Sequence, residues 1–193
     1  MPSTVLFVPG LRDHVADHWQ TLLAAEMPGS HTVPPLEADK LSRAARVAAL
    51  DRAIAAIEGP VMLVAHSAGC LTVAHWAQTH DRPIAGALFA TPADIERPLP
   101  AGYPTKEQLQ ANGWLPMPRA KLPFASLVAA SSDDPLAALD RTVALAIDWG
   151  SELALLGDLG HLNPAAGFGP WPAARGFIAT LEERAALRAR LRP

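Results

Sequence analysis

The stretch that most constrains this chain is residues 61–70, with the sequence VMLVAHSAGC. Its first five residues are apolar and include two valines, which favours a buried strand. Apolar residues at helical spacing follow in residues 71–77, so a helix is expected there. A strand, a sharp turn and a helix in that order form the context of a nucleophile elbow, which would lift the Ser67 hydroxyl above the edge of a sheet.

The elbow is a relaxed match to its usual pattern. Ala65 stands where the Gly-x-Ser-x-Gly spelling has its first glycine. The alternative interpretation is that Ser67 only caps the helix, a position that serine commonly occupies. In either case the N-terminus of a helix favours negative charge beside it.

Apolar strands alternate with amphipathic helices along the whole chain. We expect strands at residues 4–8, 31–33, 61–65, 84–90, 126–130 and 152–156. We expect helices at residues 15–27, 41–58 and 71–77, a fourth from residue 135 with Leu136, Leu139, Val143 and Ile147 on its core face, and a fifth from residue 172. This alternation predicts the α/β class, with a doubly wound, mainly parallel sheet and helices on both faces. A chain of 193 residues is expected to form a single domain, residues 1–193.

Composition and charge argue against several classes of protein. The formal net charge is −3, so the chain offers no large basic surface to nucleic acid. No apolar run approaches the ~20 residues of a membrane-spanning helix, and no signal peptide is recognisable before the first strand. Cys70 is the only cysteine, so an internal disulfide is excluded. We expect Cys70 to be a small buried side chain and not a second nucleophile. We therefore expect a soluble, cytoplasmic protein without a membrane or nucleic-acid partner, and make no prediction of its oligomeric state.

Ligands of doubly wound sheets bind beyond the carboxyl ends of the strands. The loops at residues 9–11, 66–68, 91–92, 133–135 and 157–161 follow successive expected strands and should gather on one rim. Residues 91–123 contain seven prolines and little periodicity. We interpret this segment as an ordered excursion that passes over the rim and shapes a pocket.

A nucleophilic serine needs partners that this rim could supply. Near neutral pH its hydroxyl needs an adjacent base, and that base needs a carboxylate to orient it. His161 is the best candidate base, because it lies in a glycine-containing loop just beyond the last strand. Asp134 is the best candidate acid, although it also fits an ordinary helix start before Pro135, and Asp133 is the close alternative. The chain order Ser, Asp, His is that of α/β-hydrolases.

Negative charge that develops on a reacting carbonyl oxygen needs fixed N–H donors. The candidate oxyanion donors are the backbone N–H of Ala68 and an N–H from Gly10 or Leu11, which follow the first strand. Glycine at position 10 suits a close approach of the backbone. The alternative is a plain turn at the end of a strand.

His14 and His18 stand four residues apart on the first expected helix, which is the spacing of a zinc motif. Asp17 stands where the motif has glutamate, and no third ligand is apparent, so we predict no metal site and no cofactor. His14 is instead expected to line the mouth of the pocket, with His18 capping or packing. Asn163 and Trp171 are candidates for the pocket wall. The alternative interpretation is that they only pack within a Gly/Pro-rich turn.

Several blocks of the sequence, taken in order, resemble a known family. They are FVPGL at residues 7–11, HWQ at 18–20, VAHSAGC at 64–70, ASSDDP at 130–135, GHLN at 160–163 and GFGPWP at 167–172. Together they resemble the small serine hydrolases related to retinoblastoma-binding protein 9 and to the bacterial YdeN-type proteins, from near residue 5 to near residue 178. The resemblance implies an α/β-hydrolase fold without a large cap domain, a triad of Ser67, Asp134 and His161, and esterase-like activity on small acyl substrates. It also supplies the preference for Asp134 over Asp133.

The chain departs from the family in two places. Residues 36–40 lack the tryptophan that many relatives carry after the second strand, and a Leu-x-Cys-x-Glu segment is absent, so retinoblastoma binding is not expected. We predict a cofactor-independent serine hydrolase, a carboxylesterase acting on small-molecule esters through an acyl-enzyme. The alternatives are a non-catalytic binding protein on the same fold, and an amidase or thioesterase that uses the same triad.

Overall fold

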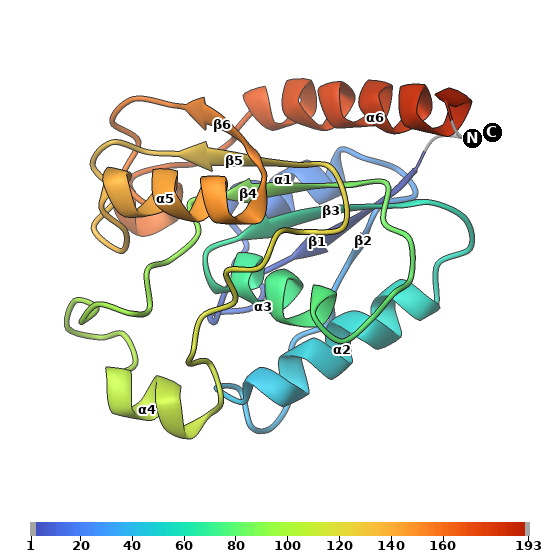
Figure 1. Cartoon of the computed structure of the whole chain (residues 1–193). Coiled ribbons are helices and arrows are strands. Elements are labelled where there is room, and N and C mark those ends of the chain that lie inside the picture. The colour runs from blue at the N-terminus through green and yellow to red at the C-terminus, as the bar shows by residue number, and fades with distance from the viewer. Residues whose placement is uncertain (1–2, 192–193) are drawn as a thin grey trace.

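A six-stranded sheet forms the centre of the computed structural model, which describes residues 3–191 (Figure 1). The strand order is β2-β1-β3-β4-β5-β6, and every neighbouring pair is parallel. The strands are β1 (Thr4–Val8), β2 (His31–Thr32), β3 (Val61–His66), β4 (Gly86–Ala90), β5 (Ser126–Ala130) and β6 (Glu152–Leu155). Because all the strands run the same way, the loops at their carboxyl ends meet along one rim.

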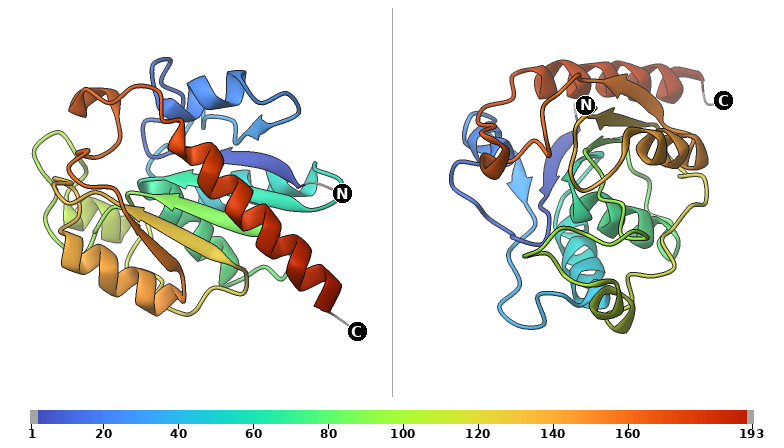
Figure 2. Two further views of the ribbon diagram at one scale, coloured as in Figure 1. Left: turned by 90° about the horizontal axis from the view of Figure 1, so that it is seen from above. Right: turned by 90° about the vertical axis from the view of Figure 1, so that its left-hand side faces the viewer.

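Helices cover both faces of the sheet. They are α1 (Trp19–Ala25), α2 (Arg43–Ala55), α3 (Ala68–Ala77), α4 (Lys106–Ala111), α5 (Leu139–Trp149), the short 3-10 helix η1 (Pro164–Ala166) and α6 (Ala173–Leu191). Helices α1 and α6 pack on one face and α2, α3 and α5 on the other, and α6 crosses the strands obliquely (Figure 2). The predicted α/β class, with its doubly wound parallel sheet, is confirmed, and no large cap domain is evident.

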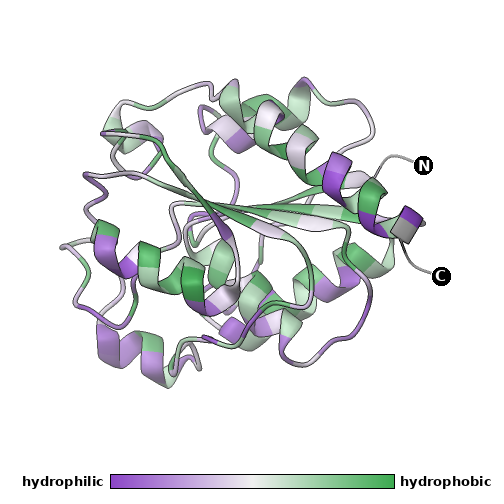
Figure 3. Cartoon of the chain, turned by 45° about the horizontal axis from the view of Figure 1, so that its top comes forward, coloured by the Kyte–Doolittle hydropathy of each residue, from purple (hydrophilic) through white to green (hydrophobic). Residues whose placement is uncertain are grey.

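Alternating side chains of the central strands supply two hydrophobic clusters, one on each face. On β3, Leu63 packs with the α2 and α3 side, whereas Met62 and Val64 pack with the α1 and α6 side. The strands are accordingly apolar on both faces, and polar residues collect on the outer surfaces of the helices (Figure 3). The two edge strands are the exceptions: both residues of β2 are polar and exposed, and Leu155 of β6 is 64% exposed. Across residues 3–191, no helix combines the length and apolar character that crossing a bilayer would require.

Helix α1 begins four residues later than its sequence pattern indicates. The structure starts it at Trp19, and the side chain of His18 caps it by accepting a hydrogen bond from the Gln20 N–H. Val15 therefore lies in the preceding loop, outside the helix. The capping imidazole fixes the helix start because it satisfies an N–H that has no partner inside the helix.

The core face of α5 differs from the predicted one, although Leu136, which precedes the helix, is buried in the core as expected. The structure buries Thr142, Leu145, Ala146 and Trp149, and leaves Ile147 73% exposed. The Trp149 ring lies 5.0 Å from that of Phe89, and its indole N–H donates to the Pro118 carbonyl oxygen at 2.9 Å. Burial of this large aromatic side chain, whose indole N–H has a hydrogen-bond partner, decides which face of α5 packs against the sheet. The face that carries Ile147 is left toward solvent.

Helix α4 is an addition to the predicted elements and lies within the proline-rich excursion. It begins with a capping box, in which the Thr105 hydroxyl accepts from the Gln108 N–H and the Gln108 side chain accepts from the Thr105 N–H. The pattern Thr-x-x-Gln was the available signal. Only one residue of this short helix, Leu109, is buried, which explains the absence of a periodic apolar pattern.

Helix α3 begins in direct contact with the end of β1, and a glycine makes that contact possible. A Cβ atom placed on Gly69 would lie 2.2 Å from the Val8 carbonyl oxygen and 2.7 Å from that of Pro9. Both obstructing atoms belong to the backbone, so neither can move aside as a flexible side chain could. The last glycine of the elbow pattern is therefore required for the packing of α3 against the sheet.

Replacing Gly69 by alanine is expected to destabilise the fold by at least about 1–3 kcal/mol, the usual cost of overpacking a core position. Urea unfolding followed by circular dichroism measures this change. Gly176→Ala is the matched control, because Gly176 lies in α6, where an added Cβ would have nothing within 4 Å, and the helical position should gain up to about 1 kcal/mol. Equal stability of G69A and the unaltered protein would contradict the steric argument.

Candidate active site

Ser67 occupies a strained turn between β3 and α3. Its backbone has φ 55° and ψ −127°, a conformation that costs a residue other than glycine about 1–3 kcal/mol. The Ser67 N–H is fixed by the Ala90 carbonyl oxygen on the neighbouring strand at 3.1 Å. The turn thus has the geometry of the predicted nucleophile elbow, with the side chain at the carboxyl edge of the sheet.

Three side chains from different loops form one chain of hydrogen bonds. His161 Nε2 lies 2.8 Å from Ser67 Oγ, and His161 Nδ1 lies 2.9 Å from both carboxylate oxygens of Asp134. The side chains of His161 and Asp134 are each only 3% exposed. Because an ionised carboxylate only accepts hydrogen bonds, Nδ1 carries the imidazole proton and Nε2 is free to accept from the Ser67 hydroxyl.

The two neighbouring aspartates have different partners. Asp134 contacts His161, whereas Asp133 Oδ1 accepts from the Gly160 N–H at 2.7 Å and from the Ser131 hydroxyl at 2.8 Å. The Gly160 N–H, followed by the Ser131 hydroxyl, lowers the pKa of Asp133. The structure therefore separates the alternatives left open by spacing: Asp133 holds the loop that carries the histidine, and Asp134 faces the imidazole.

The backbone of His161 is also held in place. Its carbonyl oxygen lies 2.8 Å from His66 Nε2 and 3.4 Å from the Thr91 hydroxyl. Burial, and then the neighbouring His161, lower the pKa of His66 well below its ordinary value. His66 is therefore neutral near pH 7, and its Nε2–H donates to the His161 carbonyl oxygen.

The loop after β1 lies against Ser67. A Cβ on Gly10 would come within 3.2 Å of Ser67 Cβ and 3.6 Å of its Oγ, so the absence of a side chain permits this approach. Gly10, Leu11 and Ala68 all line the same cavity as Ser67. Ala68 is the first residue of α3, where a backbone N–H has no partner within the helix.

Arg46 on α2 fixes the orientation of that loop. Its side chain is 7% exposed, and the guanidinium donates to the carbonyl oxygens of Gly10 at 3.2 Å and Leu11 at 3.0 Å, and to Asp13 Oδ1 at 3.0 Å. In a trans peptide the C=O and the following N–H point in opposite directions. By holding the Gly10 carbonyl, Arg46 therefore directs the Leu11 N–H to the other side of the loop. Arg46 was not among the residues expected at the site, although its i, i+4 spacing from Leu50 on the core face was a visible signal.

The cavity beside Ser67 is small and has an apolar wall. Its volume is about 220 Å³. The excursion at residues 91–123 contributes much of the wall, as expected, through Ala93, Ile95, Leu99, Tyr103, Leu109 and Trp114. At the mouth, the guanidinium of Arg12 lies 5.4 Å from the centre of the Tyr103 ring. This contact joins the loop after β1 to the excursion.

Ion pairs tie the excursion to α5. Arg141 pairs with Asp94 and Glu96, and Arg119 pairs with Glu96 and Asp148. Hydrogen bonds from Arg119 lower the pKa of Glu96. Burial partly opposes this shift, and a hydrogen bond from Arg141 adds to it. The network anchors the segment that forms the apolar wall, even though the segment has little regular secondary structure.

Trp114 in that wall is held at two points. Its indole N–H donates to the Leu41 carbonyl oxygen at 2.7 Å, and its own carbonyl oxygen lies 3.2 Å from His75 Nε2. Burial lowers the pKa of His75 to about 4. A neutral His75 therefore donates to Trp114 near pH 7.

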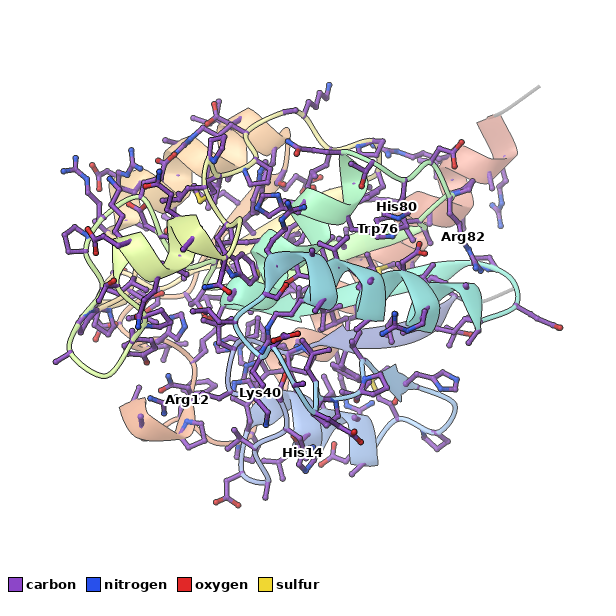
Figure 4. All side chains as sticks on the ribbon, turned by 90° about the horizontal axis from the view of Figure 1, so that it is seen from below. Arg12, His14, Lys40, Trp76, His80 and Arg82 are labelled. Carbon is purple, nitrogen blue, oxygen red and sulfur yellow. The ribbon has the colours of Figure 1, made fainter. Side chains whose placement is uncertain are left out.

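The structure treats the three predicted pocket residues differently. Asn163 lines the cavity, and its side chain caps η1 by accepting from the Ala166 N–H. His14 is exposed and lies beside α1 outside the cavity lining, so its predicted place at the pocket mouth is wrong (Figure 4). The late start of α1 removes His14 from that helix, and His18 lines the cavity instead.

Trp171 is also outside the cavity lining. It is 6% exposed, and its ring packs edge-on against Trp19 at 4.8 Å in the cluster between the sheet and α6. The alternative interpretation of this residue, packing of a Gly/Pro-rich turn, is the one that the structure supports.

Neither the histidine pair nor Cys70 offers a second reactive centre. His14 and His18 do not share a helix, and residues 3–191 contain no group of three or more His, Cys, Asp or Glu side chains placed to hold a metal ion. Cys70 is buried in α3, and burial raises the pKa of its thiol well above the ordinary value. It is the small buried side chain predicted from the sequence.

Comparison with known proteins identifies the family of this chain. A family model described as serine hydrolase matches residues 5–180. The chain belongs to this serine hydrolase family. Membership of this family and the α/β-hydrolase fold together support hydrolase activity. Among curated proteins, no match to the sequence was found.

Solved structures extend the comparison. A YdeN-like hydrolase from Pectobacterium atrosepticum is 32% identical, with a TM-score of 0.78 over 95% of this chain and 92% of the other. The ydeN gene product of Bacillus subtilis is 17% identical, with a TM-score of 0.70 over 93% and 98% of the two chains. An α/β superfamily hydrolase from Oenococcus oeni is 16% identical, with a TM-score of 0.65 over 94% and 91%. The predicted resemblance to YdeN-type hydrolases is confirmed.

Buried neutral histidines should make this hydrolase less stable as the pH falls from 7 to 5. Unfolded histidines take up protons near pH 6.5, whereas His18 and His75, each with a pKa of about 4, and the buried His66 do not do so in the fold. The unfolded state therefore binds more protons in this range, and protonation favours unfolding.

His75→Gln tests one of these contributions. Glutamine keeps a donor for the Trp114 carbonyl but does not titrate, so the slope of unfolding free energy against pH should become shallower by up to about 1.4 kcal/mol per pH unit. Urea unfolding at pH 8, 7, 6 and 5 measures both slopes, and pH 8 is the reference at which neither protein is protonated at this position. Parallel curves for the two proteins would show that the assignment to His75 is wrong.

Proposed function

We propose that this chain is a carboxylesterase that hydrolyses small acyl esters, with Ser67 as nucleophile, His161 as base and Asp134 as the acid behind it. The observation that carries the proposal is the continuous hydrogen-bonded chain of these three side chains at the wall of a cavity. In other enzymes such a chain activates a serine hydroxyl that is otherwise a poor nucleophile.

The reaction would proceed in two displacements. Ser67 Oγ attacks the acyl carbon while His161 Nε2 takes the hydroxyl proton, and the negative charge moves to the carbonyl oxygen. When that oxygen re-forms its double bond, the bond to the alcohol oxygen breaks, and His161 returns the proton to the departing alcohol. Water then attacks the acyl-enzyme, with His161 taking and returning a proton in the same way, and the acid leaves. Asp134 keeps the proton on Nδ1 and stabilises the imidazolium that forms.

The backbone N–H groups of Ala68 and Leu11 would stabilise the charged oxygen. Ala68 supplies an unpaired N–H at the start of α3, and Gly10 allows the loop to approach Ser67 closely. Arg46 supports this role from behind, because it binds the Gly10 carbonyl and so turns the Leu11 N–H in the opposite direction. Fixed donors of this kind need no reorganisation when the charge develops.

The preference for small esters follows from the cavity. Its volume of about 220 Å³ is below the ~300–1,000 Å³ of pockets that hold drug-sized ligands. The wall formed by residues such as Leu99, Leu109 and Trp114 suits an apolar acyl or alcohol group. Asn163 adds an amide to the lining and is a candidate substrate contact. The proposed chemistry uses only side chains and backbone of this chain.

Ser67→Ala is expected to abolish covalent labelling by a fluorophosphonate probe and to lower the turnover of p-nitrophenyl esters by several orders of magnitude. The unaltered protein should label, and a series of esters of rising acyl length should show the highest kcat/KM for short chains. Matched ester, amide and thioester substrates rank the three leaving groups. A protein that binds without turnover would neither label nor release p-nitrophenol, which would overturn the proposal.

The two aspartates provide a matched test of the acid. Asp134→Asn should lower kcat by about 10³–10⁴-fold, since an amide no longer holds the proton on Nδ1 of His161. Asp133→Asn retains an oxygen that can accept from the Gly160 N–H, so we expect a change of less than about tenfold. Steady-state kinetics on one p-nitrophenyl ester compares them. An equal loss in both variants would reject Asp134 as the acid.

A further inference from the structure

His18 has a fixed tautomer because it caps helix α1. Its Nδ1 accepts a hydrogen bond from the Gln20 backbone N–H at 3.2 Å. A backbone amide nitrogen can only donate, so Nδ1 carries no proton. The neutral imidazole must then carry its proton on Nε2, and Nε2 is a hydrogen-bond donor.

His18 is neutral near pH 7. Its burial, followed by the charge that His161 would carry, lowers the pKa to about 4. The side chain is in contact with other imidazoles, since its ring lies 4.5 Å from that of His66, which in turn lies 4.9 Å from that of His161. His18 is therefore one ring removed from the histidine of the proposed triad.

The Nε2–H of His18 lacks a hydrogen-bond partner within residues 3–191. The residue is buried, with an exposed fraction of 8%, and it lines the cavity together with Gln20 and Ser67. Nearly all buried donors in folded proteins are paired, and an unpaired one is costly. The neighbouring Gln20 has its amide fixed by donating to the carbonyl oxygens of Val8 and Val64, and its own side-chain oxygen makes no hydrogen bond to His18 Nε2.

We propose that the Nε2–H of His18 donates a hydrogen bond to a second oxygen atom of the substrate, separate from the reacting carbonyl. The cavity would thus favour esters that carry an uncharged accepting oxygen, such as an ether, hydroxyl or keto oxygen, within reach of the scissile bond. This inference rests on the esterase function proposed above and names the substrate class of the same site. His18 is a specificity-determining residue and takes no part in the bond changes.

The apolar wall makes this donor selective. Leu99, Leu109 and Trp114 offer only carbon surface, whereas His18 offers a donor that no group of residues 3–191 occupies. His18 and the adjoining His66 are both neutral, so this donor suits a neutral acceptor better than a carboxylate, whose desolvation the two rings could not offset. The competing explanation is that water alone occupies the donor, and esters with and without the second oxygen separate the two.

Two substitutions separate the capping role of His18 from the proposed binding role. His18→Asn keeps an oxygen at the Nδ1 position and so keeps the cap, but its amide ends one bond short of Nε2. His18→Gln reaches the position of Nε2 with an N–H group but loses the cap. Stability should follow the cap: the urea midpoint of H18Q should fall, and that of H18N should stay at the value of the unaltered protein.

Substrate discrimination should follow the donor instead. The probes are matched esters in which an ether oxygen replaces a methylene group: p-nitrophenyl methoxyacetate against the butyrate on the acyl side, and 2-methoxyethyl acetate against butyl acetate on the alcohol side. In H18N, kcat/KM should fall roughly three- to tenfold for the ether member of one pair and by less than about twofold for its methylene partner. H18Q should restore the ratio. Taking each ratio relative to the unaltered protein cancels the different intrinsic reactivities of the esters.

A second readout does not depend on turnover. In Ser67→Ala protein with ¹⁵N-labelled histidine, the His18 Nε2–H resonance should move downfield with methyl methoxyacetate or 2-methoxyethyl acetate and remain in place with methyl butyrate or butyl acetate. Equal responses to ether and methylene esters would mean that water alone meets the donor, and would overturn the inference. So would ether-to-methylene ratios unchanged in H18N while plain esters are still hydrolysed. Absence of both labelling and hydrolysis would instead overturn the esterase proposal, and the resonance would still test the binding role.

Discussion

The contact between the first turn of α3 and the end of β1 is the constraint on which the rest of the site depends. Gly69 allows the backbones of the two elements to touch, and the chain enters α3 through the strained turn at Ser67. The strain is maintained because β3 and α3 are buried on all sides and the Ser67 N–H is fixed by β4. The same close packing brings the loop after β1 against the hydroxyl, so that one local contact positions both the serine and the backbone donors beside it.

Loops from four strands complete the site, and each is held by polar contacts rather than by regular secondary structure. Arg46 holds the loop after β1, Asp133 holds the loop that carries His161, and a network of arginines and carboxylates holds the excursion to α5. His66 and His18 fill the space behind the triad as neutral imidazoles, each with one ring nitrogen assigned by a backbone partner. The polar atoms of this region therefore have defined directions, which is the condition for an electrostatically preorganised site.

Much of the fold and part of the site could be predicted because they depend on local sequence. The strands are continuous apolar runs, and the elbow is spelled out within a few residues, so β3, α3 and Ser67 were found where expected. His161 was recognisable as the histidine after the last strand. In contrast, the core face of α5 was predicted wrongly, since two apolar faces were available and the packing of Trp149 decided between them. His14 was expected at the pocket mouth because it is near Gly10 in the chain, but the structure leaves it exposed and outside the cavity lining.

The sequence by itself determined the order of strands and helices, the sharp turn at Ser67 and the kinds of side chain that follow each strand, because these are properties of neighbouring residues. Only the tertiary structure decided which aspartate faces His161, which buried arginine orients the loop after β1, and that His18, in the cavity wall, keeps a ring N–H without a partner within residues 3–191. The alternatives in each case differ only in the direction of one polar atom or in the position of one residue along the chain. They are set when loops far apart in the chain pack together, and no periodicity within a single segment encodes them.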